Sequence, residues 1–340
     1  MPNDDSASKP SVKKKHGWFF RLVRCFIIAV IVVALVSMGI LYFNIYLPQG
    51  TGPAGPDVPA EPFKHIWSEK KILLLGIGDS ITDGLGARDK YEYFELLIKN
   101  PPADSPDMNG KNLSVVFPNL KSRNKADSGS TSDEHLAVIK SLPIEANDIF
   151  GIVVMTTGGN DLIHSYGQKP PEEMAMYGAT FAQAEPWIYN FEQRLDEMMT
   201  SLKNIFPGGC QIFIANIYDP SDDTGNTKQW LTGLPSWPDG ERILRAYNKR
   251  IADCAAKYGY VHLVDIHTPF LGHGIHCRKF WLRHYHPDDP TYWYYLNIED
   301  PDERGYDAIR RLFLNEMIKV FADVNAPWPK QNSVYSESQK

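Results

Sequence analysis

The sequence predicts an α/β domain on a five-stranded parallel sheet, with helices on both faces and one transmembrane helix before it. Two observations predict this arrangement. Five short apolar runs alternate with segments of helical character, which is typical of parallel strands buried on both faces. Near the N-terminus, 23 consecutive uncharged residues run from Cys25 to Leu47. At 1.5 Å per residue they are long enough for a hydrocarbon core of about 30 Å.

The N-terminal part is predicted to have three sections. Residues 1–24 carry six basic and two acidic side chains and form a cytoplasmic tail, because positive flanks stay on the cytoplasmic side. Residues 25–47 form the membrane helix. A cleaved signal peptide is the alternative, but its apolar region is normally about 7–15 residues and ends at a small-x-small site, which we do not find. Residues 48–69, rich in proline and glycine, form a linker. The remainder is predicted to be extracytoplasmic, in a single-pass protein of the cell membrane.

The charge distribution argues against nucleic acid as a partner. The chain is 43% hydrophobic and 22% charged, an ordinary globular composition. Residues 1–24 contribute +4 to a total of −6, and no charged residue follows until Asp57, so the remainder carries −10. An acidic body of this kind repels phosphate backbones.

The body is predicted to extend over residues 70–325, followed by a polar tail over residues 326–340. The five strands are predicted at Lys71–Gly78, Ser114–Phe117, Ile149–Met155, Gln211–Ile217 and Val261–Ile266. The helices are predicted at about Tyr91–Lys99, Asp133–Lys140, Phe181–Phe206, Arg242–Lys257 and Gly305–Phe321. Parallel sheets bind ligands beyond the carboxyl ends of their strands, so we expect functional side chains directly after each run.

Three short motifs follow the first three strands. Gly78-Asp79-Ser80 puts a serine at a strand-to-helix turn, where the positive helix end favours a nucleophilic oxygen. In Asn124–Thr131, Gly129 lets the backbone approach a ligand and offer its N–H. In Thr157–Asp161, the Asn160 amide is a second donor. Helix caps and Asx turns explain each motif separately, but their order after successive strands favours one shared site.

These motifs resemble the first three sequence blocks of the SGNH, or GDSL, hydrolases, and the resemblance extends over about residues 70–323. It implies a flavodoxin-like, three-layer α/β/α fold, and hydrolysis or transfer of an acyl ester without a cofactor. It also implies that Ser80 is the nucleophile. The oxyanion hole would consist of the backbone N–H groups of Ser80 and Gly129 and the side-chain amide of Asn160. An oxyanion hole matters because losing one donor typically costs about 10²–10³ in rate.

The fourth block of the family, Asp-x-x-His-Pro, is altered. Asn297 stands where the family has aspartate, and Asp300 stands where it has histidine. Three interpretations remain open. A displaced histidine, His286 or His284, is the base and Asp300 orients it. Alternatively, Asp300 itself accepts the serine proton, which requires burial to raise its pKa above the ordinary value of about 3.9. In the third, catalysis is lost and the protein is a carbohydrate- or lipid-binding module.

An insertion precedes this block, from His273 to Tyr295. Residues 262–286 hold six of the ten histidines, but their spacing matches no strong metal signature, so no metal site is predicted. Its aromatic residues either cap the acyl pocket, stack on sugar rings or pack the insertion onto the sheet. The sequence thus predicts a membrane-anchored, extracytoplasmic serine ester hydrolase of esterase, lipase or deacetylase type, or an acyltransferase. Its predicted substrate is the acyl ester of a lipid or carbohydrate, and its site residues are Ser80, Gly129, Asn160, Asp300 and His286.

Overall fold

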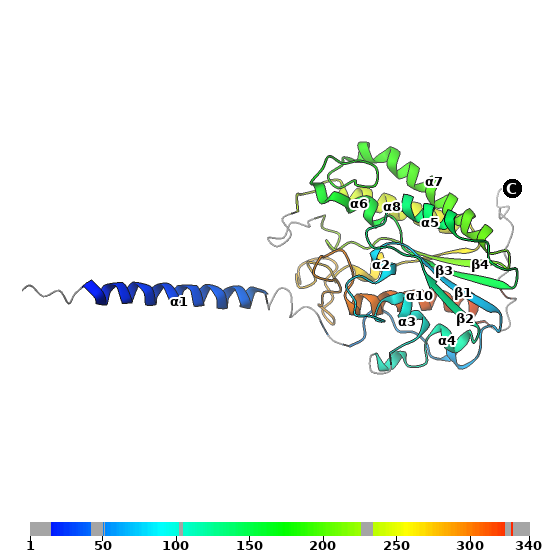
Figure 1. The fold of residues 1–340 in the computed structure, drawn as a ribbon, viewed down its shortest axis with the longest axis horizontal. Helices are drawn as coiled ribbons and strands as arrows, with labels where there is room; N and C mark the ends of the chain where they lie inside the picture. The colour runs from blue at the N-terminus through cyan, green and yellow to red at the C-terminus, as the bar shows by residue number, and fades with distance from the viewer. Residues whose placement is uncertain are drawn as a thin grey trace, which may run out of the picture. The chain divides into compact units, whose positions relative to one another are not determined.

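A computed structural model describes residues 15–41, 50, 52–101, 105–225, 234–323 and 328 of the 340-residue chain. These residues belong to two units, Met1–Gln49 and Gly50–Lys340 (Figure 1). The first contains α1 (Lys15–Leu41), which begins earlier than the predicted membrane span. Within it, Trp18–Leu41 is long and apolar enough to cross a membrane. The predicted tail before Lys15 and the predicted end of the span after Leu41 lie outside the described residues.

The second unit is built on a parallel sheet of five strands, which confirms the predicted fold class. The strands are β1 (Lys71–Ile77), β2 (Leu120–Asn124), β3 (Ile149–Met155), β4 (Cys210–Ala215) and β5 (Val261–Val264). Their order across the sheet is β2-β1-β3-β4-β5. In the central register, Gly76 of β1 pairs with Asn124 of β2 and with Val154 of β3. The first three strands therefore end side by side.

The second strand was predicted at the wrong place. Ser114–Phe117 falls on a helical turn, α4 (Leu113–Val116), whose Leu113 and Val116 are buried with Phe117. The strand is instead β2, whose residues are exposed or half-buried. Because β2 lies at the edge of the sheet, it has no continuous apolar run. The apolar run nearest to it in the sequence belongs to α4, so the pattern predicted the strand there.

Helices cover both faces of the sheet, in three layers (Figure 1). On one face lie α5 (Ser132–Ser141), α7 (Phe181–Ile205) and α8 (Gly240–Lys257); on the other lie α3 (Tyr93–Ile98), α4 and α10 (Glu303–Phe321). Alternate strand residues face opposite sides of the sheet. Leu73 and Leu75 therefore pack in the apolar cluster with α5, α7 and α8, and Ile72 and Leu74 pack in the apolar cluster with α10. The remaining short helices follow strands or lie in loops: α2 (Ser80–Asp83), α6 (Gly159–Ile163), α9 (His267–Phe270), η3 (Glu61–Lys64), η4 (Pro106–Met108) and η5 (His164–Gly167).

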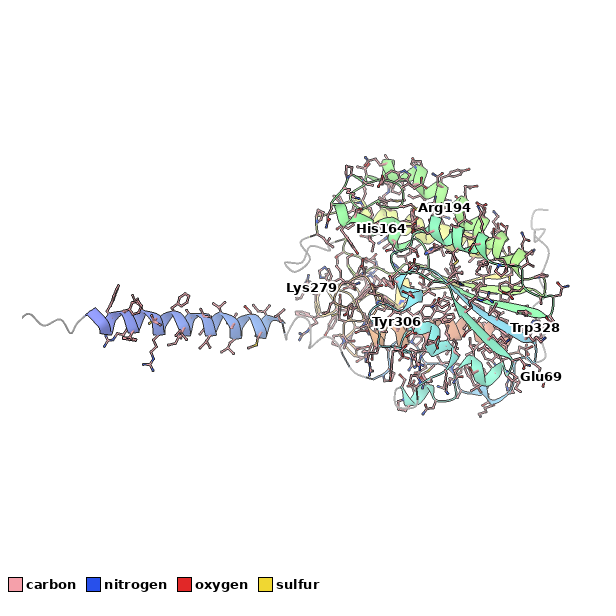
Figure 2. The ribbon with its side chains drawn as sticks, in the orientation of Figure 1. Glu69, His164, Arg194, Lys279, Tyr306 and Trp328 are labelled. Atoms are coloured by element: carbon pink, nitrogen blue, oxygen red, sulfur yellow. The ribbon has the colours of Figure 1, made fainter. Side chains whose placement is uncertain are left out.

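Much of the predicted linker packs on the domain. Ala54, Val58, Phe63 and Trp67 lie within residues 48–69 and are buried in the same apolar cluster as α10. Four apolar side chains spread over fourteen residues have no helical or strand period, so the pattern alone hid their burial. At the other end, Trp328 of the predicted polar tail stacks on Phe321 with ring centroids 5.3 Å apart (Figure 2). The other residues beyond 325 lie outside the described part.

Candidate active site

Ser80 lies directly after β1, as the first residue of α2. Gly78 makes this turn possible: its φ is +151°, and a Cβ there would lie 2.4 Å from Oγ1 of Thr156, so only glycine fits. Asp79 caps α2 by accepting the backbone N–H of Ile81 at 3.2 Å. The same oxygen, Oδ1, accepts the hydroxyl of Thr156 at 2.7 Å. The nucleophile candidate is thus held by a buried network that joins the ends of β1 and β3.

Hydrogen bonds tie the loop after β2 to the turn that carries Ser80. The carbonyl of Gly78 accepts the backbone N–H of Asp127 at 3.0 Å and the hydroxyl of Ser130 at 3.1 Å. The hydroxyl of Ser128 donates to Asp83 at 2.6 Å. Gly129 lies between these contacts with φ +85°, a backbone conformation that favours glycine. Its neighbours therefore bond to residues on either side of Ser80, although Gly129 itself is not one of the residues that line the cavity described below.

Asn160 connects the third loop to the second. It lies in α6, directly after β3, and its Nδ2 donates to the carbonyl of Ser130 at 2.9 Å. An amide has two N–H groups, so this bond fixes the side chain and leaves a second donor. The next residue, Asp161, accepts the backbone N–H of Ser132 at 3.0 Å and its hydroxyl at 2.5 Å. The three loops that follow β1, β2 and β3 are therefore bonded to one another.

Asp300 meets Ser80 from the segment before α10. It is 2% exposed. Its carboxylate accepts the Asn297 amide, and it lies close enough to the Ser80 hydroxyl for that group to lower the pKa of the carboxyl. The Asn297 donor lies 2.5 Å from Oδ2. The other oxygen, Oδ1, is buried and forms no hydrogen bond with a described residue. One carboxylate oxygen is thus held by Asn297, and the carboxylate as a whole faces the serine.

Burial sets the electrostatics of this group. Desolvation raises the pKa of the Asp300 carboxyl above its ordinary value, and the hydrogen bonds from Ser80 and Asn297 lower it in part. Desolvation also raises the pKa of Asp79 to about 6, with Asp300 adding a smaller like-charge contribution. Burial raises the pKa of Glu299 as well. Three carboxyl groups with raised pKa values therefore gather around Ser80, a pattern common at sites of proton transfer.

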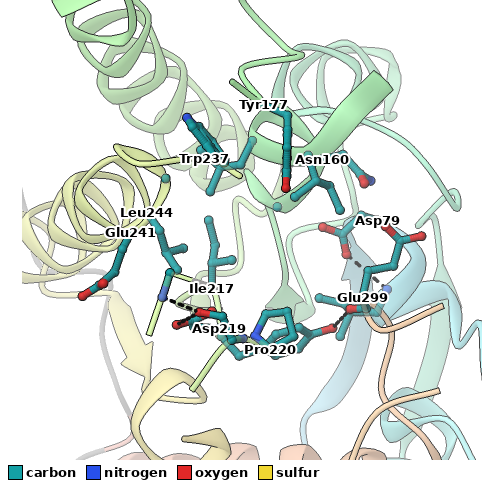
Figure 3. A pocket seen from close by; sticks show the side chains of 18 of the residues that line it. Asp79, Asn160, Tyr177, Ile217, Asp219, Pro220, Trp237, Glu241, Leu244 and Glu299 are labelled. Carbon is teal, nitrogen blue, oxygen red and sulfur yellow. Dashed lines mark hydrogen bonds between the residues drawn. The ribbon is translucent and has the colours of Figure 1, made fainter. Parts of the chain in front are cut away.

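A cavity of about 140 Å³ opens beside Ser80. Figure 3 shows Asp79, Asn160 and Glu299 on one side of it and Trp237, Leu244 and Glu241 on the other. The wall away from the serine thus combines apolar side chains, Ile217, Trp237 and Leu244, with an acidic residue, Glu241. No described residue that lines it is a histidine.

The structure directs His286 and His284 to other partners. The Nε2 atom of His286 bonds to the carbonyl of Leu271 at 2.9 Å, and its ring stacks on His273 with centroids 4.8 Å apart. The Nε2 atom of His284 lies 3.3 Å from Oδ2 of Asp223. Of the predicted site residues, Ser80 and Asn160 line one cavity and Asp300 lies beside Ser80. Gly129 lies in a loop bonded to the turn of Ser80, and His286 bonds to Leu271, just before the insertion.

The sequence analysis missed several residues of the site. Trp237 lies just before α8 and donates its Nε1–H to the carbonyl of Ala179 at 2.8 Å. Tyr177 packs against it in a tilted arrangement, with ring centroids 5.0 Å apart. Glu299 bonds to the Tyr166 hydroxyl, and its carbonyl accepts the Tyr218 hydroxyl at 2.5 Å. Trp237 and Tyr177 follow no strand directly, so the rule of searching after each strand did not reach them. For Glu299, its place between Asn297 and Asp300 was an available signal.

Comparisons with known proteins identify a family and similar solved structures. A model of the GDSL-like lipase/acylhydrolase family matches residues 77–294. No curated protein matches the sequence. Among solved structures, an extracellular lipase from Streptomyces rimosus aligns over 72% of this chain and 99% of its own, with 18% identity and a TM-score of 0.46. An acetylxylan esterase from Geobacillus stearothermophilus, solved as a catalytic mutant, aligns over 78% and 98%, with 18% identity and a TM-score of 0.45.

The family match includes the three motifs and stops before the altered block. Ser80, Gly129 and Asn160 lie inside residues 77–294, whereas Asn297 and Asp300 lie just beyond them. The match begins at Ile77, the last residue of β1, and includes β2 to β5. On this match, which covers more than half of the sequence and every strand-end motif, the chain belongs to the GDSL-like lipase/acylhydrolase family.

Proposed function

We propose that the protein hydrolyses or transfers the acyl group of an ester through Ser80, with Asp300 as the general base. One observation carries this proposal: a buried carboxylate with a raised pKa faces the serine from the block where the family has its histidine. A serine is poorly nucleophilic without a base. An ordinary exposed aspartate is a weak base at neutral pH, but burial makes this one stronger.

The proposed reaction starts with transfer of the Ser80 hydroxyl proton to Asp300. The Ser80 oxygen forms a bond to the ester carbonyl carbon, and the carbonyl electron pair moves onto its oxygen. The backbone N–H groups of Ser80 and Gly129 and the free N–H of the Asn160 amide would stabilise that oxyanion. When the intermediate collapses, the leaving alkoxide takes the proton from Asp300. Water, or an acceptor alcohol, then removes the acyl group by the same steps.

The cavity favours a short acyl group. Cavities of roughly 150 Å³ accommodate a molecule of about six heavy atoms, such as benzene, and the cavity beside Ser80 measures about 140 Å³. The apolar part of its wall, formed by Ile217, Trp237 and Leu244, suits the hydrocarbon part of that group.

We further propose that α1 anchors this domain to the cell membrane, with the N-terminus in the cytoplasm. The support is the apolar helix Trp18–Leu41 and the basic residues that precede it, which favour retention on the cytoplasmic side. A signal sequence passes the same test of length and composition. Mass determination of the N-terminus of the membrane-extracted protein distinguishes the two: an anchor keeps residues 15–41, and a cleaved signal does not.

Hydrolysis of nitrophenyl esters tests the enzymatic proposal. We expect the wild-type chain to hydrolyse acetyl and butyryl esters faster than decanoyl esters, and Ser80→Ala to reduce the rate to background while the thermal unfolding midpoint stays unchanged. A fluorophosphonate probe should label the wild type and not Ser80→Ala. Equal rates in the two proteins, with no labelling of Ser80, would contradict the proposal and favour a binding module. His286→Ala serves as the matched control for the base, and we expect it to retain activity.

A further inference from the structure

We propose that the segment Arg278–Arg283 of the insertion is a docking surface for an anionic lipid bilayer. It would be a second contact between the domain and the membrane, in addition to α1. This inference extends the proposed membrane anchoring and is independent of the proposed esterase activity.

The segment exposes two large aromatic side chains next to each other. Phe280 is 73% exposed and Trp281 is 67% exposed, with ring centroids 5.1 Å apart. The other aromatic residues of the insertion are mostly covered: Trp293 and Tyr294 are buried, and Tyr292 is half-buried. Single exposed apolar residues are ordinary, but a contiguous exposed aromatic pair points to an interaction surface. Tryptophan and phenylalanine are residues that interfacial membrane contacts use.

Basic residues surround the aromatic pair. Arg278 and Lys279 precede it and Arg283 follows it, and residues 278–283 contain no acidic residue. Figure 2 shows Lys279 at the margin of the domain. Beside the segment, Asp223 faces His284 and Arg245. The segment has a local charge of +3, which attracts anionic headgroups at short range, whereas the body as a whole carries −10 and repels them. Electrostatic attraction to an anionic bilayer is therefore confined to this segment.

A rigid base holds the segment in place. The carboxylate of Asp222 accepts three backbone N–H groups, from Gly272, Gly274 and His276, each at 2.8 Å. Asp222 is 4% exposed. Because both carboxylate oxygens are used, the start of the insertion is fixed to the loop after β4. The aromatic pair is therefore presented on an ordered platform and does not have to collapse onto the domain.

A second set of contacts holds the insertion against the residues that begin the domain. Arg304 bonds to the carbonyl of Gly52 at 3.0 Å and to Asp289 of the insertion at 2.7 Å. The insertion is therefore fixed to the domain through Asp289 as well as at its start.

Vesicle flotation of the fragment 50–340 tests the proposal without the helix. Every member of both apolar clusters lies at or beyond Ala54, so this fragment carries its complete core. We expect it to float with phosphatidylcholine vesicles that contain phosphatidylglycerol, and to float less with phosphatidylcholine alone. Phe280→Ser/Trp281→Ser should weaken binding at least about tenfold. Arg278→Gln/Lys279→Gln/Arg283→Gln should weaken it about fivefold per charge at low salt, and only on the anionic vesicles. Tyr189→Ser, which removes an exposed aromatic from α7, should have no effect.

Several results would overturn the inference. One is that the folded fragment does not float with either kind of vesicle. Another is that the wild type, the aromatic variant and the basic variant of this segment, the two patch variants, all float equally. Self-association in sedimentation that the Phe280/Trp281 variant abolishes, without vesicle binding, would assign the surface to a second copy. Hydrolysis of a soluble ester, measured on the same samples, should be unchanged by either patch variant. Loss of hydrolysis in all samples with intact flotation would therefore contradict the esterase proposal and leave docking supported.

Discussion

Asn297 and Asp300 bond to each other twice: Nδ2 of Asn297 donates to Oδ2 of Asp300 at 2.5 Å, and the backbone N–H of Asp300 donates to Oδ1 of Asn297 at 3.2 Å. The two side chains are complementary as hydrogen-bond donor and acceptor. A histidine base donates its second ring N–H and needs a carboxylate to accept it, whereas a carboxylate base only accepts and needs a donor. Asparagine in place of aspartate therefore suits aspartate in place of histidine, and the two departures from the family pattern form one consistent change.

The backbone between Asn297 and Asp300 is strained. Ile298, between the two residues, has φ +63°, a conformation in which a β-branched residue is strained. Strain of this kind persists only where the surrounding contacts impose it. Here the backbone N–H of Ile298 donates to the carbonyl of Tyr295 at 3.0 Å, and that of Tyr295 donates to the carbonyl of Asp300 at 2.7 Å. The turn holds both side chains toward each other.

We expect Asp300→Asn to lower kcat/KM by about 10²–10⁴, the range for loss of a general base. The amide keeps the shape of the side chain and an oxygen that accepts from Asn297, but it cannot take a proton. Stability should not decrease, because the variant removes a buried charge whose ionisation burial disfavours. Ester hydrolysis and urea unfolding, measured on the same samples, check both statements. Unchanged activity would exclude Asp300 as the base, and a large loss of stability would assign it a structural role instead.

The pH profile should show an acid limb that belongs to Asp300. The base must be ionised, so activity is present above the pKa of Asp300 and is lost as the pH falls through it. Burial places that limb above the ordinary aspartate value of about 3.9. Asn297→Asp should move the limb to higher pH, because it removes a donor and adds a like charge. A profile of log kcat/KM against pH for both proteins measures the shift.

Asp79 provides the control for that profile, because its pKa of about 6 lies in the same range. Asp79→Asn keeps both hydrogen bonds, since Ile81 and Thr156 donate to the same oxygen, and it removes the titration. A limb that persists in Asp79→Asn and moves in Asn297→Asp belongs to Asp300. A limb that neither variant moves and that disappears in His286→Ala would return the role of base to histidine.

The sequence predicted the parts of this protein in which one local pattern determines the structure. The apolar runs of β1, β3, β4 and β5 located four strands, and Gly78 and Ser80 were found from their position after β1. The pattern failed at β2, an exposed edge strand, and at Ala54 and Trp67, whose burial depends on α10, more than 200 residues away in the chain. The Asn297–Asp300 pair was predicted only in part. The sequence showed that both residues depart from the family pattern, but it could not show that they bond to each other.

Asn160→Ala should lower kcat by about 10²–10³ with little change in KM, because an oxyanion donor acts mainly in the transition state. Asn160→Asp tests the same point with an isosteric side chain that cannot donate when ionised. The loop should keep its position in both variants, since Ser132 and Asp161 bond the same two loops independently. Steady-state kinetics on a nitrophenyl ester measures the effect. A raised KM with unchanged kcat would show that Asn160 binds the substrate without stabilising the oxyanion.

Asp307→Ala should destabilise the domain by about 3–5 kcal/mol, the usual cost of breaking a buried ion pair from one side. Asp307 accepts Nε of Arg310 at 2.7 Å and Nε of Arg311 at 3.0 Å, and both arginines are 1% exposed. It also accepts the backbone N–H of Ala54 at 3.1 Å, so the variant loosens the contact between α10 and the residues after α1. Urea unfolding should show a lower midpoint with an unchanged slope. The matched control is Glu316→Gln, which breaks the exposed pair with Lys319 on the same helix and should change stability by no more than about 0.5 kcal/mol. Equal effects of the two variants would mean that Arg310 and Arg311 find other partners when Asp307 is absent. Asp307 would then not be needed to hold Ala54 against α10.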